Sequence, residues 1–271
     1  MSLIAQPDFD LSQYLGILDL TFQVVQSLDG KPSPDPRLAD CQHLAAKLFF
    51  HAATIYHLRQ GTKAPLASLT NGADFSDCAS VAVITRSALE TYLTMQEVFF
   101  EPVNEDEFEF NHALWQLSDA IVLENYVPSN PVLRSQAANA QQQIQALKKR
   151  LQKTAKFASM KHGEQKEALK GKRKRNWKCA AKVTGIEEKI IRLIYAYASG
   201  FVHAGGLTTF RIMAAQSAKK QIDLFELFMR PTMYVMLKMV LDYAKKFPEA
   251  KAVLEKNTGL FLGFKSGING E

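Results

Sequence analysis

The sequence predicts an all-α protein, a single helical bundle of about six to eight helices, and three observations support this. Long runs rich in Ala, Leu, Gln, Lys and Glu dominate the 271 residues, which include only 14 Gly and 10 Pro, and such runs favour helices. Apolar residues recur with helical spacing in most of them, and no segment alternates convincingly like a strand. The apolar content of 47% and the charged content of 22% are those of a globular protein.

Breaks in this pattern divide the chain into elements. The prolines between residues 32 and 36 end the first helix, Ser76 or Asp77 caps the third, and Pro231 kinks or splits the last. We expect one domain over 1–271, with a basic, partly mobile insertion of helix and loop at 148–182 and a weakly structured tail at 248–271. The expected helices are 11–28, 37–59, 76–100, 105–127, 131–160, 184–206 and 217–246.

The cysteines and the hydropathy indicate a reducing compartment. Cys41, Cys78 and Cys179 are far apart and form no CxxC motif, which disfavours a disulfide framework or a structural zinc site. The first residues lack the basic region of a secretory signal, and no run of about 18 apolar residues could span a bilayer. We therefore expect a cytoplasmic protein without a membrane partner.

Charge is strongly segregated along the chain. The net charge is +6, but residues 1–147 carry −10, residues 148–182 carry +12 and residues 183–271 carry +4. The basic character thus belongs to one short segment.

The helix that contains "RLIYAYASGFVHAGG" places Tyr195, Ser199 and His203 on one stripe, because each follows the last by four residues. Gly200 inside it permits close approach of another backbone or a ligand. Such a stripe can line a site. It can equally be a core histidine with satisfied nitrogens and a serine bonded back to its own helix.

Arg86 and Glu90, in "ITRSALETYL", are also four residues apart and share a helix face. Their neighbours are apolar, so the pair is expected to be half-buried. Because desolvation offsets most of the attraction within a buried ion pair, the pair points to function. The alternative is a surface ion pair with little effect on stability.

Together these residues resemble a bacterial helical family catalogued as domain of unknown function 5677. The resemblance covers about residues 78–206 and rests on the pattern R-x-x-x-E, then W, then Y-x-x-x-S-x-x-x-H. It implies a helical bundle with these polar groups meeting inside it, and no established activity. The Gln/Lys-rich stretch of residues 136–175 departs from the family. The matching residues are Arg86, Glu90, Trp177, Tyr195, Ser199 and His203.

If the two helices pack together, a guanidinium, a carboxylate, a hydroxyl and an imidazole converge. His203 would then be a general acid or base near neutral pH, and Arg86 would hold a phosphate or carboxylate. These groups suit a metal-independent nuclease or a small anion-binding site. The catalytic candidates are Arg86, Glu90, Ser199 and His203, with Tyr195.

The basic segment is the second candidate site. Its cations can neutralise phosphates and its indole can stack on an unpaired base. Two alternatives are a solvated loop and a segment that docks on the acidic N-terminal half of this chain or of a partner. The candidate nucleic-acid-binding residues are Lys170, Lys172, Arg173, Lys174, Arg175, Trp177 and Lys178.

Metal and cofactor sites are not expected. Glu109 and His112 form one E-x-x-H, half of what a di-iron bundle uses, and the chain has no second one. The sequence also lacks a phosphate-binding P-loop, a GxGxxG motif and a GxSxG motif.

Three hypotheses follow, in order of preference. The first is a helical interaction or regulatory protein that binds a second copy or another protein and has an internal Arg/Glu/Ser/His cluster. The second is an RNA- or DNA-binding protein that uses residues 148–182. The third is an acid–base enzyme centred on His203 and Arg86.

Overall fold

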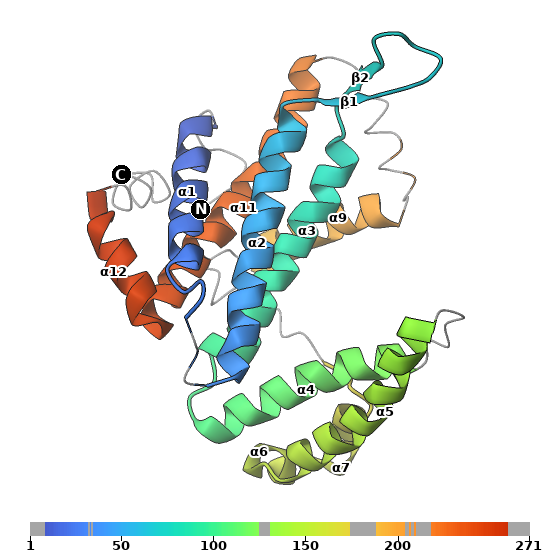
Figure 1. Cartoon of the computed structure of the whole chain (residues 1–271), viewed down its shortest axis with the longest axis vertical. Coiled ribbons are helices and arrows are strands. Elements are labelled where there is room, and N and C mark those ends of the chain that lie inside the picture. The colour runs from blue at the N-terminus through green and yellow to red at the C-terminus, as the bar shows by residue number, and fades with distance from the viewer. Residues whose placement is uncertain are drawn as a thin grey trace. The chain divides into compact units, whose positions relative to one another are not determined.

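The computed structural model describes residues 9–31, 33, 35–124, 131–173, 188–203, 206, 209 and 218–259. The chain forms two compact units (Figure 1). Unit 1 comprises Met1–Leu93 and Trp177–Glu271, and unit 2 comprises Thr94–Asn176. The described residues form ten α-helices, one π-helical turn and two short strands, so the all-α prediction is confirmed. No described helix is long and apolar enough to cross a bilayer.

Unit 1 is built around long helices. The helix α1 packs on α2, α11 and α12. Asp10 caps α1 by accepting a hydrogen bond from the Ser12 backbone N–H, and Asp77 caps α3 in the same way through Ser80, as one of the two expected caps. The helices are α1 Leu11–Gln26, α2 Arg37–Arg59, α3 Cys78–Met95, α9 Glu188–Val202, α11 Ala218–Lys246 and α12 Pro248–Lys256.

A short hairpin interrupts the helices of unit 1, although the sequence indicated no strand. Strands β1 (Thr62–Ala64) and β2 (Ala73–Phe75) pair in antiparallel register. Gly72, just before β2, has φ +70°, and a Cβ there would lie 2.5 Å from the Ala64 carbonyl oxygen. Only glycine fits this close approach of the two strands.

The helix α11 continues through Pro231 without splitting. A proline in a helix interior leaves one carbonyl of the preceding turn without its usual N–H partner. Beside it, the Thr232 hydroxyl donates to the Phe228 carbonyl, 3.0 Å away, and the Thr85 hydroxyl lies 3.4 Å from the same oxygen. The two threonines thus place buried hydrogen bonds on the carbonyl next to the one that Pro231 leaves without an N–H partner.

Unit 2 begins with the π-helical turn η1 (Gln96–Phe100) and continues with four helices. Its core is shared by α4, α5, α6 and α7, and includes Leu117, Ile144 and Phe157. The helices are α4 Glu105–Glu124, α5 Pro131–Gln152, α6 Ala155–Ser159 and α7 His162–Leu169.

Two expectations about boundaries can be compared with the structure. Residues 148–173, expected as helix and loop of a partly mobile basic insertion, form the end of α5 and the short helices α6 and α7, and Leu151, Phe157 and Ala168 are buried in the core of unit 2. The tail, expected to be weakly structured from residue 248, is helical over Pro248–Lys256. Pro248 is the first residue of α12, a position where the backbone N–H has no partner within the helix, so a proline costs no hydrogen bond there.

Candidate functional site

Polar side chains of α3 contact three different helices of unit 1. Thr85 faces α11, Arg86 and Glu90 face α9, and Ser87 faces α2. Tyr92, which is fully buried, donates its hydroxyl hydrogen to Asp242 of α11 at 2.9 Å. The helix α3 is therefore the hydrogen-bonding centre of unit 1.

Arg86, Glu90 and Tyr195 form one cluster between α3 and α9. Nη2 of Arg86 donates to the Tyr195 hydroxyl at 2.9 Å, and that hydroxyl donates to Oε1 of Glu90 at 2.6 Å. The same carboxylate oxygen lies 3.2 Å from Nη2. The guanidinium also lies over the tyrosine ring, 4.7 Å from its centroid, as in a cation–π contact. Three of the five predicted catalytic candidates thus come together.

This cluster stabilises the charged form of Arg86. Burial by itself disfavours the guanidinium, but the Tyr195 hydrogen bond and the Glu90 carboxylate outweigh it, so the pKa of Arg86 is raised. Its Nε is buried and has no hydrogen-bond partner within the part of the chain that the structure describes. Tyr195 and Glu90 occupy one edge of the guanidinium, and the cluster ties α3 to α9.

Ser199 and His203 take no part in that cluster. The Ser199 hydroxyl donates to the Tyr195 backbone carbonyl at 2.7 Å, the back-bond to its own helix given above as the alternative. His203 follows the end of α9 with an exposed side chain, and its backbone N–H donates to the Ser199 carbonyl at 3.1 Å. Among the described residues, the imidazole contacts neither Arg86 nor Glu90.

A histidine–serine pair lies on another face of α3, and the sequence analysis did not find it. Nε2 of His51 on α2 is 3.0 Å from the Ser87 hydroxyl. Burial, and then the charge of Lys47, lower the pKa of His51. No short motif links residues that are 36 positions apart, so the sequence offered no signal for this pair.

The described candidate nucleic-acid-binding residues each pair with a carboxylate of unit 2. Lys170 and Lys172 bind the two carboxylate oxygens of Glu167 at 2.9 and 2.6 Å, which lowers the pKa of Glu167 to about 2. Arg173 binds Glu97 at 2.7 Å. Lys174, Arg175, Trp177 and Lys178 lie outside the described residues.

Unit 2 shows the docking of basic on acidic residues that was one alternative for this segment. Arg150 binds Glu109 through two hydrogen bonds of 2.6 and 3.0 Å, and its Nη2 lies 3.5 Å from Nδ1 of His112. Asp106 accepts hydrogen bonds from the first backbone N–H groups of α6, where the helix dipole favours a carboxylate.

The same contacts account for the E-x-x-H motif. A guanidinium binds both oxygens of the Glu109 carboxylate, and the His112 ring is buried against Phe99, Phe108 and Trp115. Within the described residues, no group of three or more His, Cys, Asp or Glu side chains is placed to hold a metal ion.

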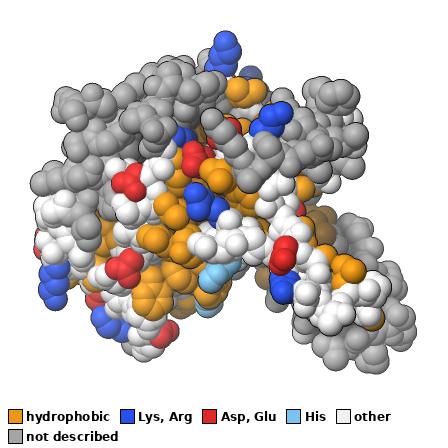
Figure 2. Space-filling model, turned by 90° about the horizontal axis from the view of Figure 1, so that it is seen from above, with side chains coloured by type: hydrophobic (Ala, Val, Ile, Leu, Met, Phe, Trp, Pro, Cys, Tyr) orange, Lys and Arg blue, Asp and Glu red, His pale blue; other side chains and the backbone are white. Residues whose placement is uncertain are grey.

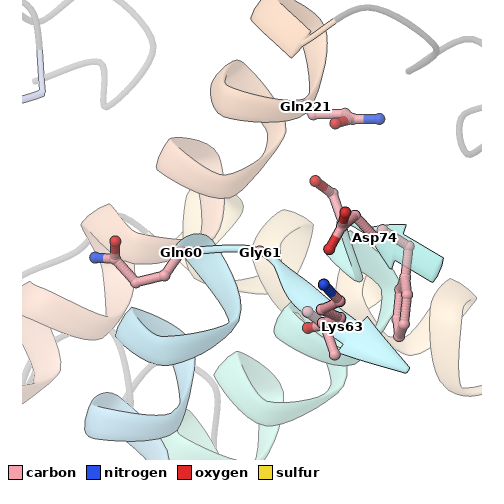
Figure 3. Close-up of a pocket in the computed structure, with 8 residues that line it drawn as sticks. Gln60, Gly61, Lys63, Asp74 and Gln221 are labelled. Atoms are coloured by element: carbon pink, nitrogen blue, oxygen red, sulfur yellow. The ribbon is translucent and has the colours of Figure 1, made fainter. Parts of the chain in front are cut away.

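A pocket of about 570 Å³ lies beside the hairpin (Figure 3). Lys63 and Asp74, which are directly opposite each other on β1 and β2, bring one charge of each sign to it, whereas the Gln60 side chain points away. This lining favours no particular ligand. It consists of Gln60, Gly61, Thr62, Lys63, Asp74, Phe75, Ser76 and Gln221.

Aromatic side chains reach the surface on α1 and α2. Phe22 lies 5.4 Å from Phe49, and Phe49 lies 5.8 Å from Phe50, measured between ring centroids. Phe22 is 44% exposed, Phe50 62% and Leu15 37%. On the side of the molecule that Figure 2 draws, hydrophobic side chains also gather among single charged ones. We call the exposed side of these two helices the α1–α2 face.

Comparison of the chain with protein-family models, with curated proteins and with solved structures finds no match. The resemblance to domain of unknown function 5677 therefore stays a prediction.

Proposed function

We propose that this chain is a protein-interaction module and that the α1–α2 face is its docking surface. The observation that carries this proposal is the aromatic run in which exposed Phe22 and Phe50 flank the half-buried Phe49. Exposed aromatic side chains that gather on one face are typical of interaction sites, where a few of them supply most of the binding free energy.

Hydrogen bonding supports an interaction role over an enzymatic one. The polar cluster of Arg86, Glu90 and Tyr195 is saturated by its own members along one edge, and the Ser199 hydroxyl is engaged within α9. A nucleophile and a base would have to be within hydrogen-bond reach of each other, and the described contacts link neither Ser199 nor Arg86 to His203.

Site-specific photo-crosslinking tests the proposal. A benzophenone amino acid replaces Phe50 in one variant and Val103 in a control, because Val103 is an apolar residue of unit 2 that is 82% exposed. After irradiation of cells that express each variant, we expect protein adducts at position 50 that are absent at position 103. Adducts no more abundant at 50 than at 103 would overturn the proposal.

A second candidate function is nucleic-acid binding by unit 2. Lys148, Lys149, Lys153, Lys161 and Lys166 are close in sequence and none forms an ion pair with a described carboxylate. Cations of this kind can contact a phosphate backbone.

Fluorescence anisotropy with a labelled single-stranded RNA across a salt series tests this second candidate. A steep salt slope is expected, and it should flatten when Lys149, Lys153, Lys161 and Lys166 become alanine. A second variant, with alanine at residues 172–175, measures how much these four cations contribute to RNA affinity. Absence of binding at low salt would exclude this candidate.

A further inference from the structure

The α1–α2 face carries two rows of exposed residues with alternating spacings of three and four. This spacing keeps each row on one side of its helix. Each row has one charged side chain, Asp19 on α1 and Lys47 on α2. The α1 row is Ser12, Leu15, Asp19, Phe22 and Gln26, and the α2 row is His43, Lys47, Phe50, Thr54 and His57.

The register of the two helices follows from one buried hydrogen bond. The Tyr14 hydroxyl donates to the Ala52 carbonyl at 2.8 Å, and the ring of Phe22 meets that of Phe49. The helices run antiparallel, side by side (Figure 1). Since both rise by about 1.5 Å per residue, Asp19, five residues after Tyr14, is level with Lys47, five residues before Ala52.

We propose that the α1–α2 face binds the same face of a second copy of this chain, around a two-fold axis parallel to the two helices. This inference rests on the interaction function proposed above and names the partner. Such an axis places α1 of one copy over α2 of the other at the same level. Asp19 then meets the partner's Lys47, and by symmetry Lys47 meets the partner's Asp19.

Charge and shape complementarity favour a second copy over an unrelated protein. The opposite charges lie level with each other, so the face complements itself under this rotation. In the same register, Leu15 lies at about the height of the partner's Phe50 along the helix axis, so an apolar contact lies next to each ion pair. Neither Asp19 nor Lys47 forms an ion pair with a described residue of its own chain, although Gln23 donates a hydrogen bond to Asp19 at 2.7 Å.

Charge reversal with compensation is the test, measured by sedimentation equilibrium over a range of protein concentrations. We expect Asp19→Lys and Lys47→Asp each to raise the dimer dissociation constant about tenfold or more, because like charges then meet twice per dimer. The double variant Asp19→Lys/Lys47→Asp should restore dimerisation, since the charges are only exchanged. Phe50→Ser should weaken the dimer roughly thirtyfold or more by removing an aromatic contact.

The control exchanges an exposed pair outside the face, Lys63→Asp/Asp74→Lys on the hairpin, and should leave the dissociation constant unchanged. Circular dichroism checks that each variant keeps its helices. A chain that is monomeric at every concentration, or a dimer that tolerates both single reversals, overturns the two-fold pairing.

The photo-crosslink at position 50 separates this inference from the proposed function. An adduct with a second copy of the chain supports both. An adduct with a different protein alone supports the interaction function and overturns self-association. No specific adduct, together with a monomeric chain, overturns both.

Discussion

The two units of this chain satisfy their charged groups in different ways. In unit 1, buried or half-buried carboxylates receive hydrogen bonds from tyrosine hydroxyls on other helices, as Glu90 does from Tyr195 and Asp242 from Tyr92. In unit 2, an acidic helix packs under basic ones, and Glu109 and Glu97 bind Arg150 and Arg173. Both of these unit 1 carboxylates also pair with a cation, Glu90 with Arg86 and Asp242 with Lys245, so the feature that distinguishes unit 1 is the additional neutral tyrosine donor.

The difference shows how segregated charge in a sequence should be interpreted. Residues 97–124 contain eight acidic side chains and no basic one, and residues 148–173 contain ten basic and two acidic ones. Within unit 2 these segments neutralise each other in part: Arg150, Lys156 and Arg173 pair with carboxylates of the acidic segment, and Lys170 and Lys172 share Glu167 of their own segment. A basic run therefore overstates the positive surface that remains for a ligand.

The largest expected effect tests whether the two units unfold separately. Leu117→Ala should destabilise unit 2 by about 3 kcal/mol, since Leu117 is fully buried in its core and the truncation leaves a cavity. Hydrogen exchange followed by mass spectrometry should show faster exchange in α4 and α5, while α1 and α2 stay protected.

The matched substitution in unit 1 is Leu48→Ala, on a fully buried residue of α2. It should accelerate exchange in α1, α2 and α11 and leave α4 and α5 protected. If either variant accelerates exchange equally in both units, the chain unfolds as one cooperative body and the comparison between the units loses its energetic basis.

The next effect concerns the oriented donors of unit 1. Tyr92→Phe should lower the free energy of unfolding by about 2 kcal/mol, because a hydrogen bond to a largely buried carboxylate is lost. Urea denaturation measures the change. The control Tyr56→Phe removes a hydroxyl that bonds to no described residue, and equal losses in the two variants would argue against a special role for the Tyr92–Asp242 bond.

The spacing of apolar residues predicted the helices well, because the apolar side of a helix repeats every three to four residues in the sequence. The helix expected over 37–59 is observed with those bounds, and Asp77 caps α3 as anticipated. The expected helix 131–160 instead ends at Gln152, where Thr154 starts the short helix α6 by accepting a hydrogen bond from Phe157. The hairpin also escaped prediction, because strands of three residues are too short to show alternation.

The sequence could predict a contact of the candidate site only where each residue belonged to a row of polar residues spaced four apart on its helix. Spacing of four grouped Arg86 with Glu90 and placed Tyr195 on its own helix, and the structure brings these three together. Spacing could not tell which residues of the α9 stripe face α3, and the hydroxyl of Ser199 bonds within α9. Pairs such as Ser87 with His51 depend on how helices pack, which no local pattern encodes.

A smaller effect tests the paired charges of unit 2. Arg150→Met should lower stability by about 1 kcal/mol at low ionic strength, because the pair with Glu109 is only partly buried. The loss should shrink as salt screens the charges, whereas the loss from Tyr92→Phe should change little. Lys149→Met, which breaks no ion pair with a described residue, is the control, and a salt-independent loss at Arg150 would remove the distinction between the two units.

The smallest effect is a pH dependence that belongs to unit 1. Burial and Lys47 lower the pKa of His51, so below about pH 6.5 the unfolded chain binds a proton that the folded chain resists. Stability from this residue is therefore present at neutral pH and is lost as pH falls through 6.5 towards the lowered value. The melting temperature plotted against pH between about 5 and 8 should show a slope that His51→Gln reduces.

The control is Ser87→Ala, which should keep this slope, because it removes the hydrogen bond but leaves the imidazole buried beside Lys47. An unchanged slope in His51→Gln would mean that other groups, such as the paired carboxylates of unit 2, govern the acid sensitivity of the chain.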